Sequence, residues 1–269
     1  MKTAMMIAPH ADDAAAFCGA TLAKLSAQGW HVILVRVTDD QKDSIGYSVE
    51  ETIEINTKEM HDAAKILGIQ EIIELGFVTD NLADVPLDNL RERFVYLFRK
   101  HKPYAVFTFD PFGLYEGNQD HTRVAQAVEE AFWVACFDKH YPGHFTEGLE
   151  PFSVCERWYF ARQLTETNHY EDVTETIDKK ILALCAHREM MKNTINQTRL
   201  QLKTYGKRVA MFDEAIDGDM SQLLGMVVKN SGKAMAVQAG WDADKFAEAF
   251  RWSRFGEMED LFERMAEDL

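Results

Sequence analysis

Short apolar runs alternate with helical patterns four times along the first half of the chain. The apolar runs are rich in β-branched and aromatic residues and predict strands at residues 3–8, 30–38, 71–75 and 105–109. After each run, apolar residues recur at steps of three and four, which predicts helices at 15–28, 49–67, 87–101 and from His121 onward. The alternation predicts an α/β fold with a doubly wound, mostly parallel, Rossmann-like sheet flanked by helices.

The second half of the chain is less regular. Residues 137–153 read as a loop and 154–162 as a further strand. Asp172, with Glu175 three residues later, resembles a helix N-cap and predicts one long helix to about Thr198. After Gly206 we expect helices at 220–228, 243–251 and 257–268. We therefore divide the chain into a main domain, 1–205, and a helical C-terminal elaboration of the same domain, 206–269.

Composition narrows the classes of partner. The net charge of −15 argues against nucleic acid and against an anionic membrane surface, since both need a basic footprint. There is no apolar run long enough to cross a bilayer and no basic-then-apolar leader, so we expect a soluble, cytoplasmic protein. The four cysteines form no C-x-x-C pair, which argues against a zinc ribbon or a redox dithiol.

Candidate chemistry gathers at the ends of two predicted strands. His10, Asp12 and Asp13 follow the first strand, and His121 closes the loop after the fourth. Both loops lie at the carboxyl edge of a parallel sheet, where open α/β folds place their sites. Imidazole and carboxylate groups are common zinc ligands, and a catalytic zinc takes three of them and keeps one position for water. A further carboxylate beside the metal can take a proton from that water.

Structural interpretations of these residues stay open at this point. A histidine at a strand end commonly makes a structural hydrogen bond, and Asp12 or Asp13 could simply cap the following helix. His121, beside Asp120, could begin a helix. One cap explains one aspartate and leaves the other without a role, but spacing alone does not decide between a metal site and a structural one.

The motifs resemble those of the LmbE-like, or PIG-L, N-acetylglucosaminyl deacetylases. The stretch Pro9-His10-Ala11-Asp12-Asp13, with Gly19 and Thr21-Leu22 further on, is similar to the family's Ala-His-Pro-Asp-Asp signature. Asp120-His121 resembles the end of its His-Pro-Asp-His motif. Further matches lie at Glu59, Ala63, Ala64, Leu67 and Gly68, and at Lys180 and His187, so the similarity covers about residues 3–200. The loop 110–116 looks most like the diacetylchitobiose deacetylase branch.

This resemblance implies a set of roles. His10, Asp13 and His121 would hold one zinc ion per chain, and Asp12 would be the general base that takes a proton from the attacking water. The implied reaction hydrolyses the acetamide of an N-acetylated amino sugar, or a similar small amide, to a free amine and acetate. The substrate is then a small molecule, and a homo-oligomer is possible because members related to this branch assemble.

Departures from the family pattern motivate an alternative. Asn118 stands where the family has the first histidine of His-Pro-Asp-His, and Asn56 stands where an arginine is often found. Asparagine can donate a hydrogen bond to an oxyanion, so we retain Asn118 as a catalytic candidate, but it cannot supply a proton. The alternative is a catalytically weak or inactive homologue that binds metal and a carbohydrate.

Three further side chains are substrate-binding candidates. Tyr115 and Glu116 lie in the loop before His121 and could touch a sugar, and Asp39 ends the second strand at the same edge. Packing, a solvated carboxylate and a loop cap are equally open interpretations of these three. A Rossmann-type nucleotide site is disfavoured, because the first strand–helix turn has no Gly-x-Gly-x-x-Gly and places two carboxylates where a pyrophosphate would lie.

Overall fold

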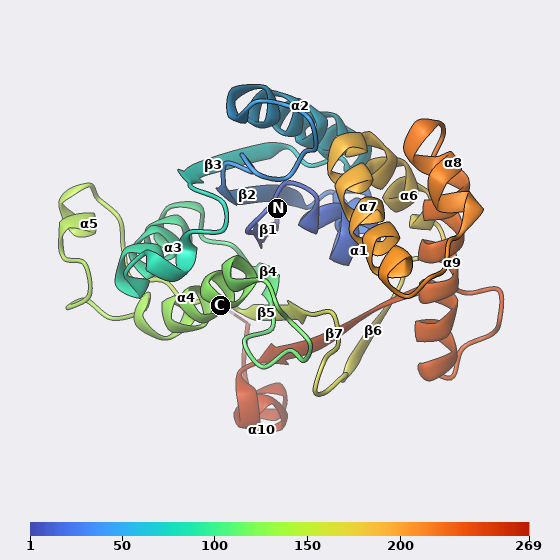
Figure 1. Cartoon of the computed structure of the whole chain (residues 1–269). Helices are drawn as coiled ribbons and strands as arrows, with labels where there is room; N and C mark the ends of the chain where they lie inside the picture. The colour runs from blue at the N-terminus through green and yellow to red at the C-terminus, as the bar shows by residue number, and fades with distance from the viewer. Residues whose placement is uncertain (269) are drawn as a thin grey trace.

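The fold is described from a computed structural model, in which residues 1–268 are placed well enough to describe. A seven-stranded sheet in the order β3-β2-β1-β4-β5-β7-β6 forms its centre (Figure 1). The first five strands along the chain are mutually parallel, and β7 runs antiparallel to both of its neighbours. The strands are β1 (Thr3–Ala8), β2 (His31–Thr38), β3 (Glu71–Phe77), β4 (Ala105–Phe109), β5 (Glu156–Phe160), β6 (His169–Asp172) and β7 (Ala247–Arg254).

Helices cover both faces of the sheet, as the alternating pattern predicted. Successive residues of β1 point to opposite faces, so Met6 packs in one hydrophobic core and Met5 in the other. The first core is covered by α1 (Asp13–Ala27), α2 (Val49–Leu67), α6 (Ile177–Ala186), α7 (Arg188–Thr204), α8 (Ala210–Asp217) and α9 (Ser221–Gln238). The second is covered by α3 (Leu87–His101) and α4 (Gln119–Val134) (Figure 1).

Three predictions for the second half are wrong. Residues 169–172 form strand β6, and Asp172 ends that strand instead of capping a helix. The single long helix is two helices, α6 and α7, which meet at His187, where the backbone leaves helical geometry at φ −79°, ψ 56°. The helix expected at 243–251 is also wrong, because its residues 247–251 belong to β7, which runs from Ala247 to Arg254. The predicted 137–153 loop also contains a short helix, α5 (Gly143–Thr146).

The sequence of β7 fits a helix as well as a strand. The segment Ala247-Glu-Ala-Phe250 carries Glu248 among small and aromatic residues, a pattern that also fits one face of a helix. In the structure Glu248 is buried and accepts the backbone N–H groups of Ala20 and Thr21, at 3.2 and 2.8 Å. Those two groups are free because α1 is kinked at Cys18. A side chain from the C-terminal segment therefore completes the helix that follows the His-x-Asp-Asp turn.

Candidate functional site

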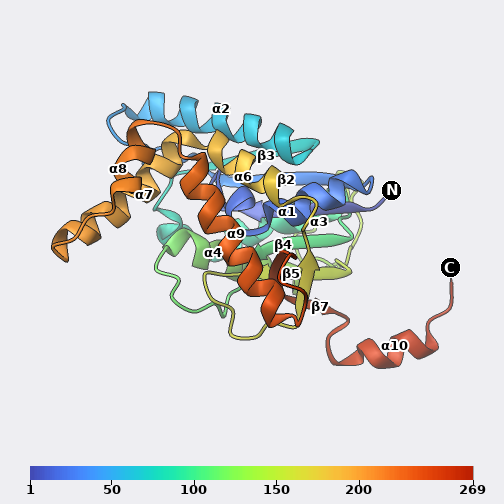
Figure 2. The same cartoon turned by 90° about the vertical axis from the view of Figure 1, so that its right-hand side faces the viewer.

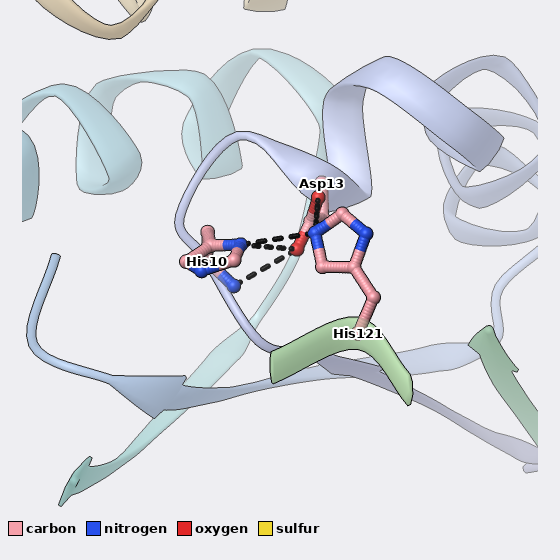
Figure 3. A group of neighbouring side chains, drawn as sticks. All are labelled: His10, Asp13 and His121. Carbon is pink, nitrogen blue, oxygen red and sulfur yellow. Dashed lines mark hydrogen bonds and ion pairs between the residues drawn. The ribbon is translucent and has the colours of Figure 1, made fainter. Parts of the chain in front are cut away.

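The candidate site is built where β1 passes into α1 and where α4 begins. His10 follows β1, Asp13 is the first residue of α1, and His121 lies in the first turn of α4 (Figure 3). All three side chains are buried, and their ligand atoms lie within 4.8 Å of one another. The structure thus brings together the three residues that the sequence proposed as metal ligands, although they are separated by 111 positions along the chain.

Local hydrogen bonds fix this turn. The backbone N–H of His10 donates to the Asp13 carboxylate at 2.9 Å, which closes the His-x-Asp-Asp turn on itself. The N-terminus of α1 also favours a carboxylate at that point through the helix dipole. The Asp12 side chain does not cap α1, so the helix-cap interpretation does not hold for it. The ring of His121 stacks on Phe109 with centroids 3.9 Å apart.

The spacing of the three donors fits a tetrahedral zinc ion. The Nδ1 atom of His10 lies 3.1 Å from Nε2 of His121, and Asp13 oxygens lie 3.4 Å from each of these nitrogens. Bonds of about 2.0–2.1 Å to nitrogen and oxygen place neighbouring tetrahedral donors about 3.3–3.4 Å apart. Two imidazoles and one carboxylate are also a donor set suited to zinc. The residues present therefore fit the metal that the resemblance implies.

Each imidazole has a carboxylate at the ring nitrogen that faces away from this centre. Nε2 of His10 lies 3.4 Å from the Asp120 carboxylate, and Nδ1 of His121 lies 2.9 Å from the Glu116 carboxylate. Asp120 is itself held by the backbone N–H groups of Asp80 and Leu82, at 2.7 and 3.1 Å. Such carboxylate–histidine pairs orient metal-binding imidazoles and raise their basicity.

The neighbouring carboxylates and imidazoles of the site shift one another's pKa values. Burial, reinforced by the negative charge of Asp13, raises the pKa of Asp12 to about 7. Burial by itself would lower the pKa of His121, but Asp13 and Glu116 raise it to about 9. The pKa of His10 is likewise raised well above its usual value, against its burial, by Asp120 and Asp13. A cation at the centre would replace these protons as the partner of the carboxylates.

The loop after β2 places two further carboxylates, those of Asp40 and Asp43, near His10. His10, Asp40 and Asp43 also place ligand atoms within 4.8 Å of one another. Asp40 has structural partners, because it accepts from the Ala11 backbone N–H and from Arg36, at 3.2 and 3.1 Å. Burial raises the pKa of Asp43 to about 7.

Sequence reasoning assigned other candidates to the substrate, and the structure places them differently. Asp39 accepts from the backbone and hydroxyl of Thr79, at 3.2 and 3.1 Å, and so ties together the ends of β2 and β3. Tyr115 is 80% exposed at the tip of its loop. Glu116 points inward to His121, as described above. Asn118 caps α4, where its side-chain oxygen accepts the Asp120 backbone N–H at 2.8 Å.

Two residues near the site were missed by sequence reasoning. Asp120 was noticed only as a neighbour of His121, although its position directly before a candidate ligand was a usable signal. Arg251 gave no local signal, because β7 brings it to the site loop from far along the chain. It holds Asp110, at the end of β4, through two hydrogen bonds of 2.7 and 2.9 Å.

Comparison with known proteins shows which family the first half of the chain resembles. Residues 5–132 match the sequence profile of PIG-L, described as GlcNAc-PI de-N-acetylase. That stretch includes His10, Asp12, Asp13 and His121. The chain carries a PIG-L domain. The resemblance inferred from the sequence motifs is confirmed, and the PIG-L match ends within α4, so β5 to β7 lie outside it.

Relatives and solved structures extend the similarity over most of the chain. A diacetylchitobiose deacetylase of Thermococcus kodakarensis is 27% identical over 190 residues, which cover 70% of this chain and 69% of that protein. A probable N-acetyl-α-D-glucosaminyl L-malate deacetylase of Bacillus cereus is 26% identical over 204 residues, covering 74% and 88%. The structure of N,N'-diacetylchitobiose deacetylase from Pyrococcus horikoshii aligns with a TM-score of 0.76 at 22% identity, covering 97% of this chain and 88% of that one.

The structural alignment confirms the predicted fold class, including the mostly parallel sheet with flanking helices. Across residues 1–268, no helix combines the length and apolar character that a membrane span requires.

Proposed function

We propose that this protein is a zinc-dependent N-deacetylase that hydrolyses the acetamide of an N-acetylated amino sugar, or of a similar small amide, to a free amine and acetate. The observation that carries the proposal is the donor triangle of His10, Asp13 and His121, spaced at 3.1–3.4 Å, with Asp12 next to it in the chain. Matches to deacetylases acting on amino-sugar compounds support the substrate class.

In this proposal the three ligands hold the metal, and Asp12 handles the proton. A zinc ion at such a site supplies a Lewis acid that acidifies water and polarises an amide carbonyl. Asp12, with a pKa raised to about 7, is suited to accept a proton from the attacking water and to return it to the leaving amine. Asp120 and Glu116 keep the imidazoles oriented, so that the donor triangle is preformed.

Asn118 has a different task from that of the family histidine. Its side-chain oxygen is engaged with the Asp120 backbone, so its amide N–H2 is the group that remains to donate. We propose that this amide supports the developing oxyanion, while the proton for the amine comes from Asp12. If it does not, the chain is a catalytically weak homologue that binds metal and carbohydrate.

The charge of the surrounding loops favours an uncharged substrate. Asp40 and Asp43 stand beside His10, and the buried Arg36 pairs with both Asp40 and Glu74. Asn56, at the position where the family often has arginine, is fully buried and donates to the Asp40 carbonyl at 3.1 Å. A phosphate or carboxylate on the substrate would therefore meet carboxylates of like charge, whereas a neutral N-acetylated sugar would not.

The experiment that tests the proposal is a hydrolysis assay with one equivalent of zinc. Purified protein is given N-acetylglucosamine, diacetylchitobiose and simple acetamides, and acetate and free amine are measured. We expect turnover of at least one amino sugar, and a loss of about 10²- to 10⁴-fold in kcat for Asp12→Asn because a general base is removed. Asp138→Asn, which changes an exposed aspartate away from the site, is the matched control and should retain wild-type kcat.

Two outcomes would contradict the deacetylase proposal in different ways. If no amide is hydrolysed although zinc binds, the protein is not a deacetylase for this class of substrate. If hydrolysis occurs only after Asn118→His, the chain is the inactive homologue of the alternative, since the histidine then supplies the missing proton donor.

A further inference from the structure

Helix α10 (Glu259–Met265) projects from the body of the protein. Figure 2 shows it beyond the end of β7, away from both helical layers. Its main contact is with the 3-10 turn η2 (Gly256–Met258), which leads into it. Arg254 fixes the orientation of the projection by pairing with Glu259 and Glu263. A segment held in place but packed against little of its own chain is a candidate for contact with another molecule.

The projecting segment carries an exposed apolar stripe. Met258, Leu261, Phe262 and Met265 are spaced at i, i+3, i+4 and i+7, and they are 37–69% exposed. Phe255, also exposed, packs edge-on against Phe262. This spacing places the apolar side chains on one face of the helix, and an exposed face of this kind marks an interaction surface. We refer to residues 255–268 as the C-terminal arm.

The charge of the arm limits what it can bind. Residues 255–268 contain six carboxylates and one arginine, for a net charge of −5. An anionic membrane surface would repel it, and helices that lie on membranes carry lysine and arginine on the polar face. Two arms packed against each other would bring like charges together. The arm therefore fits a groove that is apolar inside and basic at its edges.

One groove of the described structure has this character. It has a volume of about 690 Å³ and lies between α7 and α8, on a chain whose net charge is −15. Its lining includes the exposed apolar side chains of Leu200 and Val209. Its charged residues are Arg199, Lys203, Lys207, Arg208 and Asp213, for a net charge of +3. Asp213 pairs with both arginines, which leaves the lysines to face a partner.

A second groove is a poorer match for the arm. Trp30, Trp158 and Trp252 line it, and it is apolar enough to accept the stripe. It also contains Glu156 and Glu171, which would face the carboxylates of the arm. Charge therefore favours the groove between α7 and α8, which we call the basic groove.

We infer that the C-terminal arm of one copy of this protein docks in the basic groove of a second copy. Both views place α10 and the α7–α8 pair at different ends of the molecule, so an arm does not reach the groove of its own chain (Figures 1 and 2). The contact joins two different surfaces, which makes the interface heterologous. Repeated head to tail, such contacts close into a ring or extend as a filament. The mode of recognition is a helix in a groove.

Charge reversal provides a sharp test. One variant, Lys203→Glu with Lys207→Glu, takes the groove from a net charge of +3 to −1. Another variant replaces four carboxylates that do not pair with Arg254, in Glu257→Lys, Asp260→Lys, Glu267→Lys and Asp268→Lys, and takes the arm from −5 to +3. Sedimentation velocity of the full chain at about 100 µM, well above a micromolar dissociation constant, should show an oligomer for the wild type. Each variant alone should associate about tenfold or more weakly, because like charges then meet at every contact.

Mixing the two variants should restore assembly. The acidic arm of the first variant meets the wild-type basic groove of the second, and the basic arm of the second meets the acidic groove of the first. Leu261→Asp with Phe262→Asp disrupts the apolar stripe and should be monomeric on its own, because no arm is then left that can dock in its groove. Circular dichroism of each variant checks that the fold is kept. A monomeric wild type, charge variants that assemble normally, or a mixture that stays monomeric would each overturn the inference.

Discussion

At the scale of single residues, the candidate centre depends on how two imidazoles are held. His10 and His121 each present one ring nitrogen to the centre and the other to a carboxylate, Asp120 or Glu116. This arrangement decides which nitrogen is free to bind a cation. The sequence could propose His10 and His121 as ligands, because residue type and strand position are visible in it. The carboxylate that faces the outer nitrogen of each ring could not be assigned from the sequence, since it depends on how Glu116 and Asp120 are oriented in the fold.

Glu116 offers a direct test of this arrangement. In Glu116→Ala, His121 loses the carboxylate 2.9 Å from its Nδ1 atom. We expect zinc affinity to fall by about 10- to 100-fold, as it does when such outer carboxylates are removed elsewhere. Competition with a chromogenic chelator measures the affinity. Glu166→Ala, which alters an exposed glutamate, is the control, and equal affinities for the two variants would contradict the role given to Glu116.

At the scale of elements, the C-terminal segment supports the helix that begins at the site. The kink at Cys18 frees backbone N–H groups of α1, and Glu248 of β7 accepts them. Lys180 of α6 donates to Glu248 at 2.6 Å and completes a buried ion pair. The strand could not be predicted, because its charged residue is satisfied by partners that lie 68 and more than 200 positions away. We propose on this basis that 206–269 belongs to the same domain as 1–205.

Replacing Glu248 should show how much the contact between β7 and α1 stabilises the protein. Glu248→Ala leaves the Lys180 ammonium buried without its partner, and we expect a loss of about 3–5 kcal/mol in the free energy of unfolding. Urea unfolding followed by circular dichroism gives the value. The double variant Lys180→Met, Glu248→Leu should recover much of it, because no uncompensated charge remains.

An exposed ion pair provides the comparison for that experiment. Lys229 pairs with Asp178 at 2.9 Å on the surface, so Lys229→Ala should cost about 0–1 kcal/mol. A similar small effect for Glu248→Ala would mean that β7 is not needed to support α1.

At the scale of the whole molecule, the order of elements in the first half could be predicted from the sequence. In the second half the prediction found β5, α10 and the start of α9, and it missed β6, β7 and the break between α6 and α7. The order of elements from β1 to α4 follows from local periodicity, because each strand–helix unit is complete within a short stretch. Strands β6 and β7 depend on partners that are distant in the sequence. The break between α6 and α7 at His187 has no proline or glycine that would mark it. The same partners bury ionisable groups whose protonation links stability to pH.

His187 makes stability depend on pH in a definite direction. Burial lowers the pKa of this imidazole from 6.5 to about 4, and within residues 1–268 its Nδ1 atom has no hydrogen-bond partner. Between these two values the unfolded chain binds a proton that the folded protein does not. The free energy of unfolding should therefore fall as the pH is lowered from about 6.5 to 4, by up to about 3 kcal/mol from this group.

The contribution of His187 is isolated by comparing how steeply the free energy of unfolding changes with pH in two variants. His187→Asn should flatten the dependence of the unfolding free energy on pH in this window, whereas His61→Asn, at a half-exposed histidine, should leave the slope as in the wild type. Urea unfolding at a series of pH values measures both. Parallel curves for His187→Asn and the wild type would contradict the prediction.

We propose that His10, Asp13 and His121 hold one metal ion and that Asp12 is not one of its ligands. Zinc stoichiometry by competition titration tests it directly, in the wild type and in His121→Ala and Asp12→Asn. We predict one equivalent of tightly bound zinc for the wild type and for Asp12→Asn, and loss of tight binding for His121→Ala. Zinc bound equally well without the His121 imidazole would contradict the account.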